Sequence, residues 1–132
     1  MADKENTIKN FSQTWPMPKE LSPIIIIGTG GIVKDAHLPA YKKAGFEVHG
    51  LYDVDSKKAK SLAEEFGINK VFDSLEEALQ HTDNIFDLAL PPANLLEVVE
   101  KLPKNIHAVF QKPLGRSLEE GNKIRKICHE KN

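Results

Sequence analysis

A glycine-rich turn is the first group of residues in this chain that could do chemistry. It reads Gly28-Thr29-Gly30-Gly31-Ile32 and directly follows four consecutive isoleucines. Gly28 and Gly30 allow a tight turn and a close approach of the backbone to a ligand. Where such a turn leads from a strand into a helix, backbone N–H groups and the helix dipole point at an anion. The spacing therefore predicts a phosphate-binding turn.

Asp53 is the second candidate, and its chemistry would select a cofactor. It ends the apolar run Phe46–Tyr52, about 25 positions after Gly28. An acidic residue there accepts hydrogen bonds from the adenosine ribose hydroxyls of a dinucleotide and repels a 2′-phosphate. No arginine follows to offset that repulsion, so NAD is favoured over NADP, and the nearby Lys57 and Lys58 keep NADP as the less favoured alternative. A turn or helix-capping aspartate is the alternative.

Two further motifs follow later apolar runs. Leu90-Pro91-Pro92 is either a stiff apolar lip against the adenine or nicotinamide half of the cofactor, or an ordinary strand-to-helix turn. Gln111-Lys112-Pro113 places a lysine at the end of the last apolar run. The ammonium of Lys112 could bind a substrate oxygen and move a proton during hydride transfer. A solvated lysine before a turn is the alternative.

The remaining reactive side chains favour structural roles. His37 lies close behind the glycine turn, where we expect it to be structural rather than catalytic. The other histidines are scattered, and no pair has metal-ligand spacing, so no metal site is predicted. Cys128 lies on an apolar helix stripe and is expected in the core.

From Pro23 onward, short apolar runs alternate with helical patterns. Strands are expected at residues 24–27, 46–52, 70–72, 85–90 and 106–110. Pro39 falls inside the first helical segment and should begin or kink that helix. Asp55 and Ser74 occupy positions typical of helix N-caps, and Gly67 follows a helical stretch. The order predicts an α/β protein with a doubly wound parallel sheet, the Rossmann fold.

Composition and charge exclude several function classes. The 132 residues suit one domain, and a net charge of −1 provides no basic excess for nucleic acid or an anionic membrane. The apolar runs are far shorter than the roughly 18 residues of a membrane span, and residues 1–22 lack the apolar core of a signal peptide. The single cysteine fits a reducing compartment. We expect a cytoplasmic protein.

Residues 1–21 are expected to form an N-terminal extension and residues 22–132 an NAD(P)-binding domain. Pro16 and Pro18 exclude a regular helix in the extension. Phe11 and Trp15 are expected to include one aromatic anchor on the domain surface, and a partner-binding role is the alternative.

Taken together, the motifs resemble one family over about residues 22–132. The glycine turn with Ala36-His37-Leu38-Pro39-Ala40 behind it, Asp53, the proline lip and the Gln111-Lys112-Pro113 motif occur in the order found in the Gfo/Idh/MocA family. That family contains glucose–fructose oxidoreductase, inositol dehydrogenase and rhizopine catabolism proteins. The resemblance implies an NAD(P)-dependent oxidoreductase, a dehydrogenase acting on a hydroxyl of a sugar, an inositol or a related polyol.

The resemblance also implies residue roles. Lys112 matches the catalytic lysine that contacts substrate, and Gln111 matches a residue near the nicotinamide that is usually glutamate. Many members carry a histidine where this chain has Asn94-Leu95-Leu96. We therefore predict one cofactor site, formed by Gly28, Thr29, Gly30, Gly31, Ile32, Asp53, Leu90, Pro91, Pro92, Gln111 and Lys112.

Members of this family continue into a substrate domain, and we expect these 132 residues to be a fragment without it. We therefore expect cofactor binding with little or no turnover from these residues alone, and a homo-oligomer only in a longer parent protein. A non-catalytic NAD(P)-sensing regulator on the same scaffold is one alternative, since Gln111 and the missing histidine leave room for it. A different nucleotide-dependent α/β enzyme, such as a methyltransferase, is another.

Overall fold

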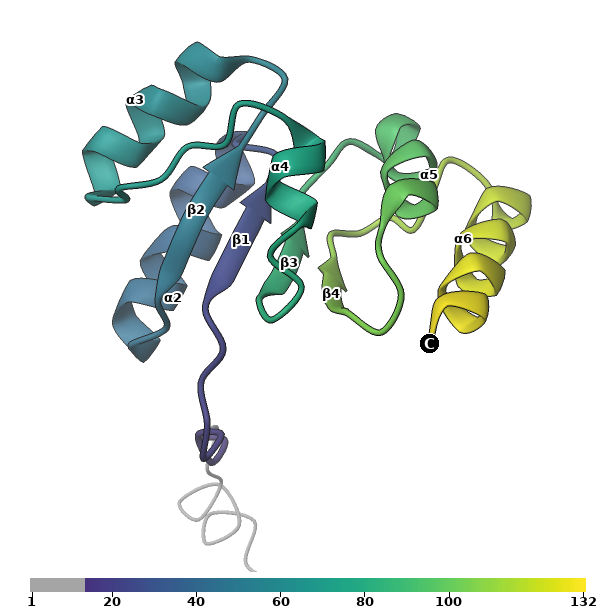
Figure 1. The fold of residues 1–132 in the computed structure, drawn as a ribbon, viewed down its shortest axis with the longest axis horizontal. Helices are drawn as coiled ribbons and strands as arrows, with labels where there is room; N and C mark the ends of the chain where they lie inside the picture. The colour runs from purple at the N-terminus through teal and green to yellow at the C-terminus, as the bar shows by residue number, and fades with distance from the viewer. Residues whose placement is uncertain (1–13) are drawn as a thin grey trace, which may run out of the picture.

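A computed structural model describes residues 14–132, which fold around one parallel sheet (Figure 1). The strand order is β2-β1-β3-β4, and every neighbouring pair is parallel. The bounds are Ile24–Ile27 for β1, Val48–Tyr52 for β2, Ile85–Leu88 for β3 and His107–Phe110 for β4. β1 therefore lies in the interior of the sheet, as expected for a strand made entirely of isoleucine.

Both faces of β1 are buried, in two separate core clusters. Ile25 and Ile27 pack in one cluster, whereas Ile24 and Ile26 pack in the other. The alternation arises because successive side chains of a strand point to opposite faces of the sheet. The sheet consequently needs a layer of helices on each side.

Helices supply both layers. They are η1 (Val33–His37, a π-helical turn), α2 (Leu38–Ala44), α3 (Ser56–Phe66), α4 (Leu75–Leu79), α5 (Pro92–Lys101) and α6 (Leu118–Lys131). Side chains of η1, α2 and α3 join the cluster around Ile26. Those of α4, α5 and α6 join the cluster around Ile25. The predicted doubly wound α/β Rossmann fold is confirmed.

The predicted strand at residues 70–72 is wrong, because only one residue of it pairs. Val71 forms an isolated parallel bridge with Leu51, through hydrogen bonds from Leu51 N to Lys70 O and from Phe72 N to Leu51 O. Phe72 then turns into the core, where it is 2% exposed, and α4 begins at Leu75. The segment therefore contributes one bridge and no strand.

The residues predicted to begin, cap or end helices do so in the structure. Pro39 lies in the first turn of α2, directly after the π-helical turn of η1. Asp55 caps α3 by accepting from the amides of Lys57 and Lys58. Gly67 ends α3 in the left-handed conformation, at φ 69°. No helix within residues 14–132 is long and apolar enough to cross a membrane.

The expected aromatic anchor is not formed by Trp15, whose surface is 88% exposed. The segment from Thr14 to Pro23 contains no helix or strand. Phe11 lies outside the described residues.

Candidate functional site

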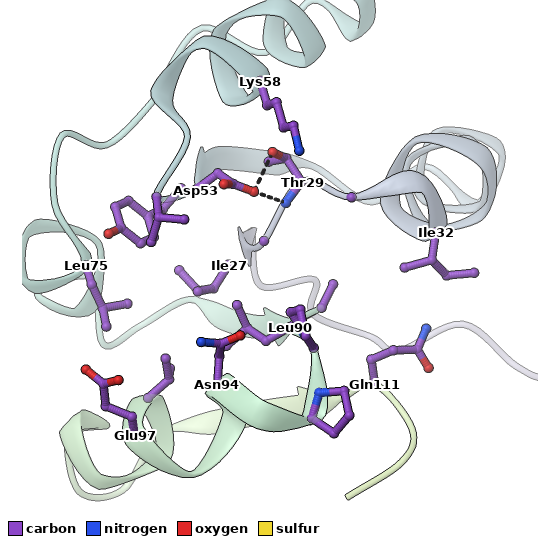
Figure 2. A pocket seen from close by; sticks show the side chains of 18 of the residues that line it. Ile27, Thr29, Ile32, Asp53, Lys58, Leu75, Leu90, Asn94, Glu97 and Gln111 are labelled. Atoms are coloured by element: carbon purple, nitrogen blue, oxygen red, sulfur yellow. Dashed lines mark hydrogen bonds between the residues drawn. The ribbon is translucent and has the colours of Figure 1, made fainter. Parts of the chain in front are cut away.

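A cleft of about 730 Å³ lies at the carboxyl ends of the strands (Figure 2). β1 pairs with β2 on one side and β3 on the other, so the winding of the chain reverses at β1. Ligands bind open α/β sheets at this reversal, and small-molecule sites typically enclose roughly 300–1,000 Å³. Every residue predicted for the cofactor site lines the cleft except Gly31.

The glycine turn forms one wall because its backbone passes directly over the end of β3. Gly28 has φ +99°, and a Cβ there would lie 2.4 Å from the carbonyl oxygen of Ala89. A Cβ at Gly30 would meet nothing within 4 Å, so this part of the turn is open. The helix begins at once, with Val33 N and Lys34 N donating to Gly30 O. The amides that come before these two at the start of the helix have no acceptor inside it and can bind an anion.

Asp53 connects this turn to the end of β2. Its Oδ2 accepts hydrogen bonds from Thr29 N at 2.7 Å and from Thr29 Oγ1 at 2.8 Å (Figure 2). Its Oδ1 accepts from Asp55 N at 2.8 Å, while Asp55 itself caps α3. Asp53 thus accepts hydrogen bonds within the turn after β2, whereas the helix cap is Asp55. Lys58 reaches from α3 toward Thr29 along the same wall.

The proline motif forms the facing wall. Pro91 is the N-cap and Pro92 the first residue of α5, the arrangement of an ordinary strand-to-helix turn. Both prolines also line the cleft with Leu90, so the two interpretations describe the same residues. The helices α4 and α5 add cleft residues that the sequence did not predict, namely Leu75, Glu76, Asn94, Glu97, Val98 and Lys101.

Gln111 and Lys112 follow β4 and close one end of the cleft. Figure 2 shows Gln111 and Ile32 at this end, away from Leu75 and Glu97. Gln111 N donates to Leu88 O, which extends the ladder beyond β4. Lys112 N donates to Gln111 Oε1 at 2.8 Å, and the Lys112–Pro113 peptide is cis.

A hydrogen-bond chain that the sequence did not predict links Gln111 to the interior of the sheet. His37 Nδ1 lies 2.7 Å from Asp87 Oδ2, and His37 Nε2 lies 3.2 Å from Gln111 Nε2. Tyr41 donates its hydroxyl to the same Asp87 oxygen at 2.7 Å, and burial together with this contact raises the pKa of Tyr41. A charged residue inside an apolar strand was the available signal, because buried carboxylates need partners.

Cys128, which the sequence places in the core, lies outside the cleft. Cys128 is half-buried and packs against the core cluster around Ile25. Within residues 14–132, no group of three or more His, Cys, Asp or Glu side chains is arranged to hold a metal ion.

A doubly wound parallel sheet with a glycine turn, an acidic residue after β2 and a cleft at the switch point defines a nucleotide-binding α/β domain. The model of the Gfo/Idh/MocA oxidoreductase family, described as an NAD-binding Rossmann fold, matches residues 23–132. The chain belongs to this family.

Individual relatives cover most of this chain but a smaller part of their own length. An uncharacterised protein of Saccharomyces cerevisiae is 34% identical over 114 residues, covering 78% of this chain and 31% of the relative. Glucose-6-phosphate 3-dehydrogenase of Bacillus subtilis is 29% identical over 103 residues, which cover 77% of this chain and 29% of the relative. An oxidoreductase structure from Thermotoga maritima has 29% identity and a TM-score of 0.78, and the match covers 86% of this chain and 36% of that structure. The chain spans about a third of the length of these curated relatives.

Proposed function

We propose that residues 22–132 bind NAD in preference to NADP, as the nucleotide domain of an oxidoreductase acting on a hydroxyl of a sugar or related polyol. The observation that carries this proposal is the cleft at the switch point, where the glycine turn and Asp53 share a wall. The name of the Bacillus subtilis relative, glucose-6-phosphate 3-dehydrogenase, supports a sugar-like substrate.

In this proposal Asp53 recognises the adenosine ribose. The contacts from Thr29 and Asp55 fix its carboxylate, and a carboxylate has about four acceptor positions. Room therefore remains for a ribose hydroxyl. A 2′-phosphate would face this negative charge, although Lys58 on the same wall reduces the repulsion. The preference for NAD is therefore modest.

Lys112 is proposed to handle the substrate proton. When bound, the nicotinamide ring supplies the hydride acceptor or donor. Lys112 as a neutral amine takes the hydroxyl proton during alcohol oxidation, and as an ammonium returns a proton to the carbonyl oxygen during reduction. Gln111, beside it, offers amide groups to the nicotinamide end of the cofactor.

Calorimetric titration of the chain with NAD, NADP and S-adenosylmethionine tests the proposal. We expect NAD to bind more tightly than NADP, and S-adenosylmethionine not to bind. A folded sample that binds S-adenosylmethionine and neither dinucleotide would overturn the proposal in favour of a methyltransferase-like protein.

A non-catalytic NAD(P) sensor is the second candidate, favoured by two residues in the cleft. Gln111 is uncharged where the family usually has glutamate, and Asn94 stands where many members have histidine. Saturable NAD binding combined with no NADH formation from a panel of sugars and polyols, by the protein that contains this domain, would select the sensor.

A further inference from the structure

We propose that Asp87 is a positioning residue that fixes the proton of His37 on Nδ1 and thereby sets the orientation of the Gln111 carboxamide in the cleft. The assignment of the nicotinamide amide as the ligand of that carboxamide rests on the function proposed above. The hydrogen-bond chain itself belongs to the unliganded protein and can be tested separately.

The donors and acceptors along the hydrogen bonds from Asp87 through His37 to Gln111 allow one arrangement of protons. The Asp87 carboxylate accepts only, so the short contact at 2.7 Å requires a proton on His37 Nδ1. The amide nitrogen of Gln111 donates only, so His37 Nε2 must be an unprotonated acceptor. The imidazole is therefore neutral and has its proton on the nitrogen that faces the sheet.

The contact of the Gln111 amide oxygen supports the same orientation of the carboxamide. Its Oε1 accepts from Lys112 N at 2.8 Å, which requires the oxygen to face Lys112 and the nitrogen to face His37. The carboxamide is thus held at both ends. One amide N–H and one oxygen lone pair remain for a ligand, and a primary carboxamide is complementary to that pair.

Asp87 is an unfavourable residue for its location unless it has such a role. It is 1% exposed between Phe86 and Leu88, and among the described residues nothing donates to its Oδ1. The hydrogen bonds of His37 and Tyr41 both fall on Oδ2. A buried carboxylate with an unpartnered oxygen lowers stability, so its contribution is to orientation rather than to the fold.

Without an acceptor at Asp87, the proton on His37 Nδ1 loses its hydrogen bond, and only the contact of Nε2 with Gln111 still favours this tautomer. A proton on Nε2 would face the N–H of Gln111, donor against donor. To relieve this contact the carboxamide would turn over, give up the hydrogen bond from Lys112 N and present the wrong groups to the cleft. A ligand lacking an amide at this end would be unaffected, and ADP-ribose, which is NAD without nicotinamide, is such a ligand.

The test combines ring-nitrogen NMR of His37 with titration of NAD and ADP-ribose, on wild type, Asp87→Ala, Asp87→Asn and Tyr41→Phe. Asp87→Asn keeps an oxygen where His37 and Tyr41 donate. Tyr41→Phe removes the other hydrogen bond to Asp87 and leaves the contact with His37.

We expect wild type, Asp87→Asn and Tyr41→Phe to carry the His37 proton on Nδ1, and Asp87→Ala to move it to Nε2. Asp87→Ala should bind NAD roughly three- to tenfold more weakly, the size of one hydrogen bond, with unchanged affinity for ADP-ribose. In a His37→Ala background, Asp87→Ala should cause no further loss, because Asp87 acts through His37.

A wild-type proton on Nε2 would overturn the proposal without any variant having to fold. Equal weakening of NAD and ADP-ribose by Asp87→Ala would also overturn it, since that indicates general damage. If wild type bound neither ligand, the proposed function would fail, while the tautomer of His37 would still decide whether the chain of hydrogen bonds exists.

Discussion

Thr29 and Asp53 show how the residues of the cleft are held before a ligand arrives. The backbone amide and the hydroxyl of Thr29 both donate to one oxygen of Asp53, which ties the glycine turn to the end of β2. Groups already fixed in a binding geometry lose less conformational freedom on association. The side chain that would recognise the ribose therefore also shapes the turn that would bind the phosphates.

Asp53→Ala should weaken NAD binding about tenfold and relax the preference over NADP. The substitution removes the ribose acceptor, worth roughly 1.5 kcal/mol as a charged hydrogen bond, and the charge that repels a 2′-phosphate. Calorimetric titration with both cofactors measures the change. Asp83→Ala, an exposed aspartate outside the cleft, is the matched control. An unchanged NAD/NADP ratio in Asp53→Ala would contradict the ribose role.

Lys112→Met should lower the rate of NADH formation about 100-fold and leave NAD affinity within about twofold. The reason is that the Lys112 amine is assigned to the proton of the substrate hydroxyl rather than to the cofactor. The assay uses the protein that contains this domain, with the sugar or polyol that it oxidises. Lys104→Met changes an exposed lysine outside the cleft and should leave the rate unaltered. Equal rates in the two variants would remove Lys112 from the mechanism.

Spacing along the chain could predict those side chains that follow strands, but not the ones that meet across the sheet. Asp53 and Lys112 each follow an apolar run, so the parallel sheet alone brings them to one edge. The contact of His37 with Asp87 joins residues 50 positions apart, and its contact with Gln111 joins residues 74 apart. Those contacts depend on the strand order and on the helical turn carrying His37, which no local pattern encodes.

At the scale of elements, the end of β1 is where backbone conformation matters most. Gly28→Ala should destabilise the fold by about 3 kcal/mol, because the new Cβ adds a clash with Ala89 O to the strain of a positive φ. Gly67→Ala has a similar positive φ but meets nothing within 4 Å, so it should cost only about 1 kcal/mol. Urea denaturation of both variants measures the difference. Equal losses would show that the close approach to β3 can relax.

The start of α6 should make stability depend on acid pH. Hydrogen bonds from Arg116 hold the pKa of Glu120 below its ordinary value. A lowered folded-state pKa stabilises the protein above the ordinary glutamate pKa, and this stabilisation is lost as the pH falls through the lowered value. Arg116→Gln should therefore lower the free energy of unfolding at neutral pH and have little effect in strong acid.

Denaturant titrations across this pH range measure the effect of Arg116→Gln. Arg125→Gln, at an exposed position of α6, is the control. Its free energy of unfolding should follow the same pH dependence as that of wild type. A constant difference between Arg116→Gln and wild type at every pH would show that the contact acts through packing and not through charge.

The sequence predicts helices and strands correctly where their patterns are long. The prediction fails where tertiary packing decides whether a segment pairs as a strand. The isoleucine run and the helix caps act locally, so β1 and the ends of α3 lie where they were expected. The segment 70–72 has the residue types of a strand, but Phe72 is taken up by the core after a single bridge. The π-helical turn before Pro39 was not predicted, although a break at that proline was.

At the scale of the whole molecule, β4 is the edge of the described sheet opposite to β2 (Figure 1). Its Val109 is 54% exposed, and a strand edge with exposed apolar side chains can pair with another copy. We expect concentration-dependent self-association of this chain by light scattering. Val109→Lys should reduce it, whereas Leu118→Lys, at an 82% exposed position on α6, should not. Equal effects would indicate nonspecific association.

The π-helical turn that carries His37 has a consequence for chain length. A π-helix holds one more residue per turn than the α-helix into which it is inserted, so η1 acts as a one-residue insertion. Deleting a residue between Val33 and His37 would restore α-helical winding and rotate the preceding segment by about 100° relative to α2. With α2 held in the core by Leu38, the glycine turn would lose its alignment with the cleft. Homologues with the Asp87–His37–Gln111 chain should therefore conserve the length of this segment more strictly than its sequence.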